Sequence, residues 1–307
     1  MFAIGDPLSV PGGVLQKVAT LARSSNARIE LFHALDESLP WVTEPARRGP
    51  LSPLRESERI VARARHRLER IARDARFRGC RLNIEVRWDR PPHEAIVRAA
   101  LRSRADLVIA STHAHGRTGR LLLRNTDWEL MRECPCPLLL VKSSRTHRQG
   151  SILITVDPFH AHAKPSHLDA RLLESGEHLA ALLRKPAHAF HAYMPLIPVG
   201  SPGEPMVWED PAVERTHAAE VRAEFDRLAA KAGIPRARRH LVVGDVPSGL
   251  GATAARVRAD VVVMGAVSRS GLRRLFIGST AERVLDELRC DVLIVKPQGF
   301  RTRVPAR

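Results

Sequence analysis

One stretch of the sequence has the residue types and the spacing of a phosphate-binding loop. Gly265 follows a short apolar run, and a Gly-Ser-Thr triplet at residues 278–280 opens a predicted helix further along. Glycine lets the backbone approach a ligand closely because it has no Cβ. Free amide groups and the helix dipole then favour an anion at the start of the helix. A simpler interpretation stays open, since Ser279 and Glu282 also have the spacing of a capping box.

The elements that must position this loop alternate between short apolar runs and helical patterns. Strands are predicted at residues 152–157, 187–193, 240–244, 260–265 and 291–296. Helices are predicted at residues 168–183, 212–232 and 279–288, with a short helix before residue 260. Gly233 has the usual position of a residue that ends a helix. This alternation is typical of a parallel sheet with crossover helices, in which ligands bind beyond the carboxyl ends of the strands. The crevice is therefore expected after Asp157, after Gly265 and before Ser279.

The chain carries this pattern twice. Residues 126–142 and 280–296 align without a gap, 154 positions apart, and Cys136 stands opposite Cys290. A repeat of this length has the size of a domain and is too long for one unit of a solenoid. The chain is therefore expected to hold two fused copies of one fold.

The first copy has its elements in the same order. Its strands are predicted at residues 2–5, 28–34, 82–88, 106–111 and 137–142. Its long helix is predicted at residues 56–78 and ends before Gly79. We therefore predict an α/β protein of two tandem, doubly wound, Rossmann-like parallel five-strand sheets. The domains are expected at residues 1–145 and 150–307, joined by a linker at 145–150.

Composition narrows the class of protein. A chain of 307 residues that is 44% hydrophobic can bury two cores without a metal or a disulfide. Its four cysteines show no framework spacing: Cys134-Pro-Cys136 is not a CxxC pair, and single thiols in apolar surroundings usually serve packing. The sequence has no secretory signal and no apolar run of membrane-spanning length. We therefore predict a reduced, cytoplasmic protein without a membrane span.

The charge is strongly basic, with 49 Lys and Arg against 33 Asp and Glu, and most of the excess lies in the first copy. The segment 59–78 concentrates it, with arginines at Arg59, Arg63, Arg65, Arg67, Arg70, Arg73, Arg76 and Arg78. Such a face can bind nucleic acid or anionic lipid, or it can simply be the solvated side of a helix. Aromatic residues make up only 4% of the chain, which disfavours a platform for base stacking.

Other chemistry has weaker support. Histidines gather in two short segments, at His113 and His115 and at His160, His162 and His167. Alternating histidines on a loop are usually solvated, and no cysteine or clear carboxylate completes a tetrahedral metal site. The sequence has neither a Gly-Lys-Ser/Thr P-loop nor a Gly-x-Ser-x-Gly elbow. We therefore expect no required metal and no dedicated catalysis, while slow hydrolysis of ATP by a bound water stays open.

The loop and its flanking strands resemble those of the universal stress proteins. The ATP-binding loop of that family reads Gly-x-x-Gly, nine residues, then Gly-Ser/Thr. This sequence has Gly265, then Ser268 at the second glycine, nine residues, and Gly278-Ser279. The strand end Thr155-Val156-Asp157 and the closing CDVLIVKP also resemble the family. With two copies in one chain, the sequence is most similar to the tandem, E-type members.

The resemblance implies an adenine-nucleotide alpha-hydrolase-like fold and a function as a stress-response ligand sensor that binds ATP or a related adenine nucleotide. The implied nucleotide-binding residues in the second copy are Val156, Asp157, Met264, Gly265, Ser268, Arg269, Gly278, Ser279 and Thr280. The first two would face the adenine, Met264 and Gly265 the base and ribose, and the last three the phosphates. Ser268 departs from the family and is more restricted than glycine, which puts the affinity in question.

The first copy departs further from the family loop. Ser111 or His113 stands at its first glycine and Arg124 at its phosphate glycine, although residues 116–119 keep a Gly-Arg-Thr-Gly. We therefore predict that the first nucleotide loop is degenerate. The resemblance also implies an internal pseudo-dimer packed through residues 138–141 and 292–295, and a further homodimer stays open. The competing hypothesis is a basic scaffold that binds nucleic acid, anionic lipid or a protein partner without nucleotide.

Overall fold

The chain forms two compact units. A computed structural model describes residues 1–36, 53–111, 125–145, 147, 149–159, 167–195, 211–266, 283–285 and 287–306. Unit 1 comprises Met1–Arg145 together with Gly299–Arg307, and unit 2 comprises Thr146–Gln298. The C-terminal segment after Gln298 therefore packs with unit 1, whereas the second predicted domain ran to residue 307.

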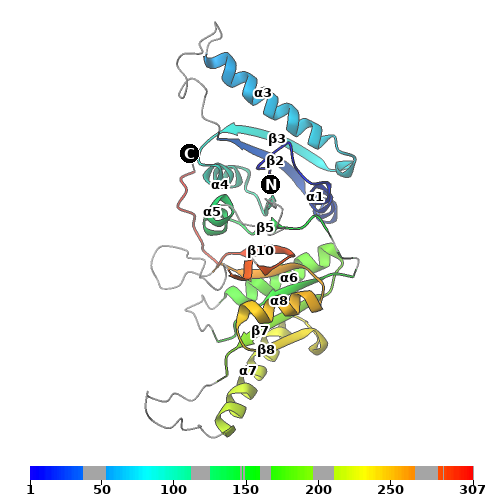
Figure 1. Cartoon of the computed structure of the whole chain (residues 1–307), viewed down its shortest axis with the longest axis vertical. Coiled ribbons are helices and arrows are strands. Elements are labelled where there is room, and N and C mark those ends of the chain that lie inside the picture. Colours follow the sequence, from blue (N-terminus) through cyan, green and yellow to red (C-terminus); the bar gives the residue numbers. More distant parts are fainter. Residues whose placement is uncertain are drawn as a thin grey trace. The chain divides into compact units, whose positions relative to one another are not determined.

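Unit 1 is a five-strand parallel sheet with its helices on the outside (Figure 1). Its strands are β1 (Phe2–Ala3), β2 (Arg28–Leu35), β3 (Arg81–Trp88), β4 (Val108–Ser111) and β5 (Leu138–Val141). Its helical segments are α1 (Gly12–Ser24), α3 (Pro53–Ala72), η1 (Ala75–Phe77), α4 (Pro92–Ser103) and α5 (Asn125–Glu133). The strand order is β3-β2-β1-β4-β5. All five predicted strands are present, although β1, β4 and β5 are shorter than predicted.

Unit 2 repeats this architecture (Figure 1). Its strands are β6 (Ser151–Thr155), β7 (Ala187–Tyr193), β8 (Arg239–Val243), β9 (Ala259–Gly265) and β10 (Asp291–Val295). Its helical segments are α6 (Leu168–Leu183), α7 (Pro211–Lys231), η2 (Arg236–Arg238) and α8 (Val246–Arg256). Read in the same sense as unit 1, the strand order is β8-β7-β6-β9-β10, which matches unit 1 position for position. Residues 283–285 and 287 of the predicted last helix are helical, and its first residues lie outside the described part.

The first strand of each unit is central, because the chain winds to one side of it and then to the other. In unit 2, β6 pairs in parallel with β7 through Ile154 and Ala189, and with β9 through Ile154 and Val263. In unit 1, β1 pairs in the same way with β2 and with β4. The reversal of winding beside the first strand is the topological switch point, where α/β sheets open a crevice.

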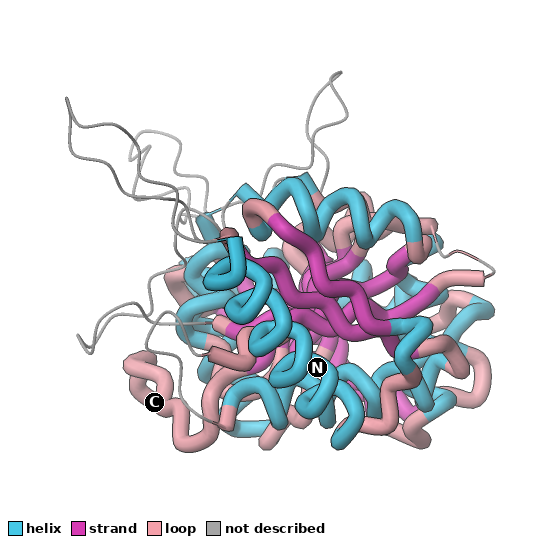
Figure 2. The backbone as a smooth tube through the Cα atoms, turned by 90° about the horizontal axis from the view of Figure 1, so that it is seen from below, coloured by secondary structure: helices cyan, strands magenta, loops and turns pink. Residues whose placement is uncertain are grey.

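The strands lie at the centre of the structure with helices around them (Figure 2). In unit 2 the helices cover both faces of the sheet. The α8 helix packs on the face that carries Phe190, because a Cβ added at Gly249 would meet that ring. Next along the strand, His191 points to the opposite face and contacts Phe225 of α7. The α6 helix lies so close to the strands that a Cβ on Gly176 would fall 2.4 Å from a side-chain atom of Ile154. No helix in the described ranges is long and apolar enough to cross a membrane.

The long helix of unit 1 ends earlier than the sequence predicts. The α3 helix stops at Ala72, and a separate turn, η1, follows it. The side chain of Asp74 accepts a hydrogen bond from the backbone amide of Arg76 at 2.9 Å, which caps the new turn and breaks the helical run. Gly79, with φ +80°, therefore follows η1 and does not end α3. In unit 2 the prediction is confirmed, since Gly233 has φ +67° just beyond α7.

Candidate functional site

The structure brings four predicted site residues to one edge of the unit 2 sheet. Val156 and Asp157 follow β6, while Met264 and Gly265 end β9, and β6 and β9 are neighbouring parallel strands. The Thr155 hydroxyl donates a hydrogen bond to the Val263 carbonyl at 3.1 Å and ties the two strand ends together. The other five predicted residues lie outside the described part of the chain: Ser268, Arg269, Gly278, Ser279 and Thr280.

The backbone of Val156 is fully engaged within the protein. Its amide donates to the Phe190 carbonyl at 3.0 Å, and its carbonyl accepts from Nδ1 of the buried His191 at 3.0 Å. The Val156 side chain is 6% exposed. Val156 can therefore offer a ligand an apolar surface, whereas its amide and carbonyl already have partners.

Asp157 is held in place by a residue that sequence reasoning missed. Its backbone amide donates to Oδ1 of Asp169 at 3.1 Å, and Asp169 is 2% exposed in the first turn of α6. An acidic residue in the first turn of a helix is commonplace because it complements the dipole. The sequence therefore gave no specific sign that Asp169 fixes the loop after β6.

Gly265 has a packing role that is independent of any ligand. A Cβ at this position would lie 2.8 Å from Cδ2 of Leu168 and 3.5 Å from Cδ1 of Leu172, both on α6. Leu168 and Leu172 are completely buried, so neither side chain can move aside into solvent. The glycine is thus needed for the close approach of α6 to the end of β9, whereas the sequence pattern explains the same glycine by the close approach of a ligand.

The corresponding edge of unit 1 is built differently. Asp6 follows β1, and its carboxylate accepts hydrogen bonds from the Leu8 amide at 2.8 Å and the Ser9 hydroxyl at 3.0 Å, which forms a local turn. Ser111 ends β4 where Gly265 ends β9. The predicted remnants of the first loop, His113, His115, residues 116–119 and Arg124, lie outside the described residues.

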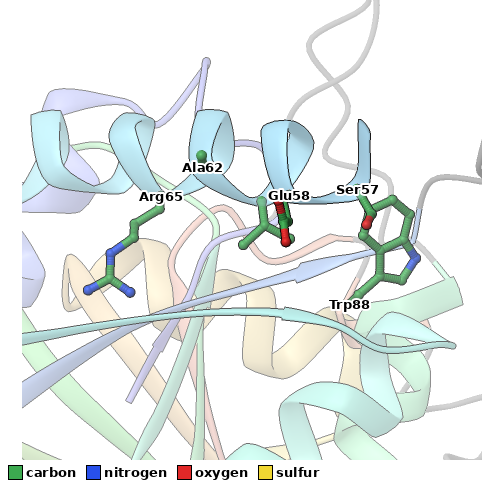
Figure 3. A pocket seen from close by; sticks show the side chains of 6 residues that line it. Ser57, Glu58, Ala62, Arg65 and Trp88 are labelled. Carbon is green, nitrogen blue, oxygen red and sulfur yellow. The ribbon is translucent and has the colours of Figure 1, made fainter. Parts of the chain in front are cut away.

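Two adjoining cavities lie in unit 1, around α3 and the edge strand β3. The first, about 610 Å³, is lined by Ser57, Glu58, Val61, Ala62, Arg65 and Trp88. Figure 3 shows the Trp88 ring beside the first turns of α3, with Arg65 further along the helix. The second, about 520 Å³, shares Arg65 and Trp88 and continues along β3 to Arg102. Neither cavity involves a predicted nucleotide-binding residue.

Only some arginines of the predicted basic segment, residues 59–78, share one face of α3, and Arg55 just before the segment joins them. Exposed arginines recur along one face of α3, at Arg55, Arg59, Arg63 and Arg70. We call these four residues the arginine stripe. Arg76 lies outside α3 and is paired with Asp74 at 2.7 Å, and Arg65 lies 3.6 Å from Glu69.

A histidine pair joins β7 and β8. Nδ1 of His188 and Nε2 of His240 are 2.9 Å apart, and the rings are stacked. Burial, followed by the neighbouring His188 and Arg256, lowers the pKa of His240 to about 4. Burial and Arg238 also lower the pKa of His188. Both rings are therefore neutral at physiological pH.

The metal hypothesis finds no support in the described ranges, where no group of three or more His, Cys, Asp or Glu side chains is placed to hold an ion. Of the five histidines considered for metal binding, only His167 belongs to these ranges, directly before α6. His113, His115, His160 and His162 lie outside them.

The fold and the site geometry together define a class of protein. Each unit is an open, doubly wound α/β domain, and unit 2 brings four of its nine predicted ligand residues to the switch point of the sheet. Domains of this class bind their ligands beyond the carboxyl ends of the strands.

The chain belongs to the Universal stress protein family, which it matches over residues 4–142 and 151–296. It is 32% identical to Universal stress protein E of Escherichia coli K12 over 234 residues, 74% of this chain and 72% of the relative. It is 29% identical to Universal stress protein E of Photorhabdus laumondii over 230 residues, 74% and 73% of the two chains. The predicted family and its tandem arrangement are confirmed.

Solved structures agree with the fold. A functionally unknown protein from Pseudomonas aeruginosa PAO1 superimposes with a TM-score of 0.74 at 24% identity, over 96% of this chain and 92% of that one. A universal stress protein from Archaeoglobus fulgidus has a TM-score of 0.55 at 14% identity, over 96% and 97%. These similarities confirm the α/β fold of two tandem domains and bear on the fold alone.

Proposed function

We propose that this universal stress protein is a ligand sensor that binds ATP or a related adenine nucleotide in unit 2 and performs no dedicated catalysis. The observation that carries the proposal is the adjacency of the ends of β6 and β9. Val156, Asp157, Met264 and Gly265 gather there, at the switch point where sheets of this type open a crevice. The loop resemblance supplies the ligand class.

Each residue of the edge has a distinct part in this proposal. The base and ribose lie against the apolar side chain of Val156 and the backbone of Met264 and Gly265. The Asp157 carboxylate accepts hydrogen bonds from donor groups of the base or ribose. The phosphates contact the loop and the start of the last helix, through Ser268, Arg269, Gly278, Ser279 and Thr280. The described residues supply no metal site, and in this proposal the first copy binds no nucleotide.

The proposal is tested by identifying the small molecules that the purified protein releases on heating. A Gly278→Arg variant, which places in unit 2 the residue type of Arg124, serves as the disrupted site. Gly251→Arg serves as the matched control, because it adds the same charge to unit 2 at a position in α8 where a Cβ meets open space. We expect mass spectrometry to find ATP or ADP with the native chain and the control, and none with Gly278→Arg.

The outcome that overturns the proposal is equally clear. No nucleotide would be released, and added ATP would leave the melting temperature of the native chain unchanged. Release of equal amounts from all three proteins would place the nucleotide elsewhere in the chain.

A second candidate function is a basic scaffold that binds a polyanion without nucleotide, and the arginine stripe favours it. The four side chains are exposed at intervals of four, four and seven residues, so they share one helix face. The buried residues of α3, Ala64 and Leu68, lie on the side of the helix that packs on the sheet. The stripe therefore has no apolar face to insert into a membrane, which favours nucleic acid over lipid.

Salt dependence tests this candidate. A fluorescent single-stranded DNA should bind more weakly as salt rises, and each phosphate contact removed should lower the salt slope by about one. The variant Arg59→Ser, Arg63→Ser, Arg70→Ser removes three members of the stripe. A control that replaces Arg215, Arg222 and Arg227, exposed on α7, removes the same charge. Equal loss of binding in both variants, or no binding at all, would reject a site on α3.

A further inference from the structure

Two cysteines of unit 1 lie side by side in the connection between α5 and β5. The helix ends at Glu133 and the strand begins at Leu138, so Cys134 and Cys136 both belong to the short link. Their sulfur atoms are 4.0 Å apart. The sequence alone favours a packing role for the pair, because it lacks CxxC spacing. The structure places the two thiols in contact.

The two thiols differ in access and in acidity. Cys134 is completely buried, whereas Cys136 is partly exposed. The hydrogen bond with the Cys134 thiol lowers the pKa of Cys136, burial opposes this, and the positively charged amino group of Met1 lowers it further. The thiolate is the reactive form of cysteine. An external reagent therefore meets Cys136 first, with Cys134 directly behind it.

The backbone geometry permits a bond between the two sulfurs. Residues two apart have Cα atoms separated by about 7 Å at most, and disulfides usually bridge Cα distances of about 4.4–6.8 Å. The sulfurs must approach each other by roughly 2 Å to reach a bond length of about 2.05 Å. Closing this gap requires rotation of the two side chains together with an adjustment of the link.

We propose that Cys134 and Cys136 form a redox site that reduces hydroperoxides and stores the oxidation as a disulfide. The Cys136 thiolate attacks one peroxide oxygen, the O–O bond breaks, and the leaving alkoxide or hydroxide takes up a proton, which leaves a sulfenic acid on Cys136. Cys134 then attacks that sulfur, the S–S bond forms, the S–O bond breaks, and the departing hydroxide takes the thiol proton as water. The two thiols supply the two electrons that the peroxide gains, and an external dithiol returns the pair to its reduced form.

Unit 2 contains a natural comparison for this site. Cys290 stands opposite Cys136 in the gap-free alignment, and Leu288 stands opposite Cys134. Cys290 is also partly exposed and directly precedes β10, as Cys136 directly precedes Pro137 and β5. The second copy thus has the position of the reacting thiol without the second thiol.

The test is a thiol count and a peptide map after treatment with a small excess of hydrogen peroxide. The native, fully reduced chain should lose two of its four free thiols, and mass spectrometry should find one disulfide between Cys134 and Cys136. Dithiothreitol should restore both thiols. Cys290→Ser and Cys80→Ser should leave this result unchanged.

Single variants of the pair separate the two roles. Cys134→Ser should trap the sulfenic acid at Cys136, seen as a dimedone adduct that the native chain lacks. Cys136→Ser should leave the buried Cys134 unreacted. The proposal is overturned if the native chain keeps all four thiols under peroxide, or if the disulfide joins Cys80 or Cys290 instead. Because the thiol count and peptide map use the native chain, they decide the question even if a variant fails to fold.

Discussion

At the scale of single residues, both units use a buried histidine to complete the end of their first strand. His191 donates through Nδ1 to the Val156 carbonyl at 3.0 Å, and His33 donates through Nδ1 to the Ile4 carbonyl at 2.7 Å. A buried carbonyl at a strand end needs such a partner, because an unsatisfied one is costly. The gap-free comparison of the copies does not align the two histidines, which are 158 positions apart instead of 154. Sequence reasoning therefore missed both.

Replacing Gly265 by alanine should destabilise unit 2 by about 1–3 kcal/mol. The added methyl group would lie 2.8 Å from Leu168, which is fully buried and must shift together with α6. Gly251→Ala is the control, because it meets open space inside α8 and should stabilise the chain by about 0.5–1 kcal/mol. Urea denaturation measures both changes. A Gly265→Ala variant as stable as the native chain would contradict the packing role.

Because the His188–His240 pair has lowered pKa values, we predict that the folded protein loses stability in mild acid. The folded-state pKa of His240 is about 4, below the ordinary value of 6.5, because of burial, His188 and Arg256. Between these two pH values the unfolded state binds more protons than the folded state, so stability should fall as pH falls from about 6.5 towards 4. A His240→Gln variant should lose less stability over this range. Urea midpoints across the range measure the slope.

The control for this slope is His178→Gln, since His178 is an exposed histidine on α6. It should keep the native dependence on pH. Parallel stability curves for the native chain and His240→Gln would show that His240 does not contribute to the acid sensitivity.

At the scale of elements, hydrophobic periodicity predicted the bounds of those helices and strands whose ends are set by packing in the core alone. The bounds of α6 and β7 agree residue for residue with the prediction, because every turn of α6 places an apolar residue on the sheet. Periodicity failed where a local hydrogen bond decided. In α3 the apolar pattern continues past Ala72. The helix nevertheless ends there, because the Asp74 side chain accepts a hydrogen bond from the Arg76 amide and starts a separate turn.

The C-terminal segment is an element that the sequence did not predict. Its Arg303 and Thr302 converge on Glu133 at the end of α5 within unit 1, with the Arg303 amide and Nε each 2.9 Å from a carboxylate oxygen. The segment has no periodicity and no motif, so it could not be assigned to a partner surface in advance. Burial would raise the pKa of Glu133, but the hydrogen bonds from Arg303 and Thr302 hold it below its usual value.

Glu133→Gln should release this segment. The loss of a charged acceptor for several donors should cost about 1 kcal/mol, a value reduced because the Arg303 side chain is 55% exposed. Trypsin should then cut after Arg301 and Arg303 several-fold faster, as followed by mass spectrometry. Glu129→Gln, which removes a surface pair with Arg132 on the same helix, should leave the cleavage rate unchanged. Equal rates in both variants would show that Glu133 does not hold the segment.

At the scale of the whole molecule, the duplication allowed the fold to be predicted from the sequence. It predicted the position of the candidate site, but not the contacts that shape it. The rule that ligands bind at the carboxyl ends of strands predicted where Val156, Asp157 and Gly265 would gather. It could not reveal that Asp169 fixes Asp157, or that Leu168 occupies the space beside Gly265, because both contacts depend on where α6 meets the sheet. The two copies also differ in charge. Residues 1–148 carry 27 basic and 16 acidic side chains, and residues 149–307 carry 22 and 17.

The central claim is that one of the two copies binds an adenine nucleotide and the other does not. Isothermal titration of the native chain, freed of bound nucleotide, with ATP measures this directly as a stoichiometry. We predict one site per chain, abolished by Gly278→Arg and kept by Gly251→Arg. Two sites per chain, no binding, or one site that survives Gly278→Arg would contradict the account.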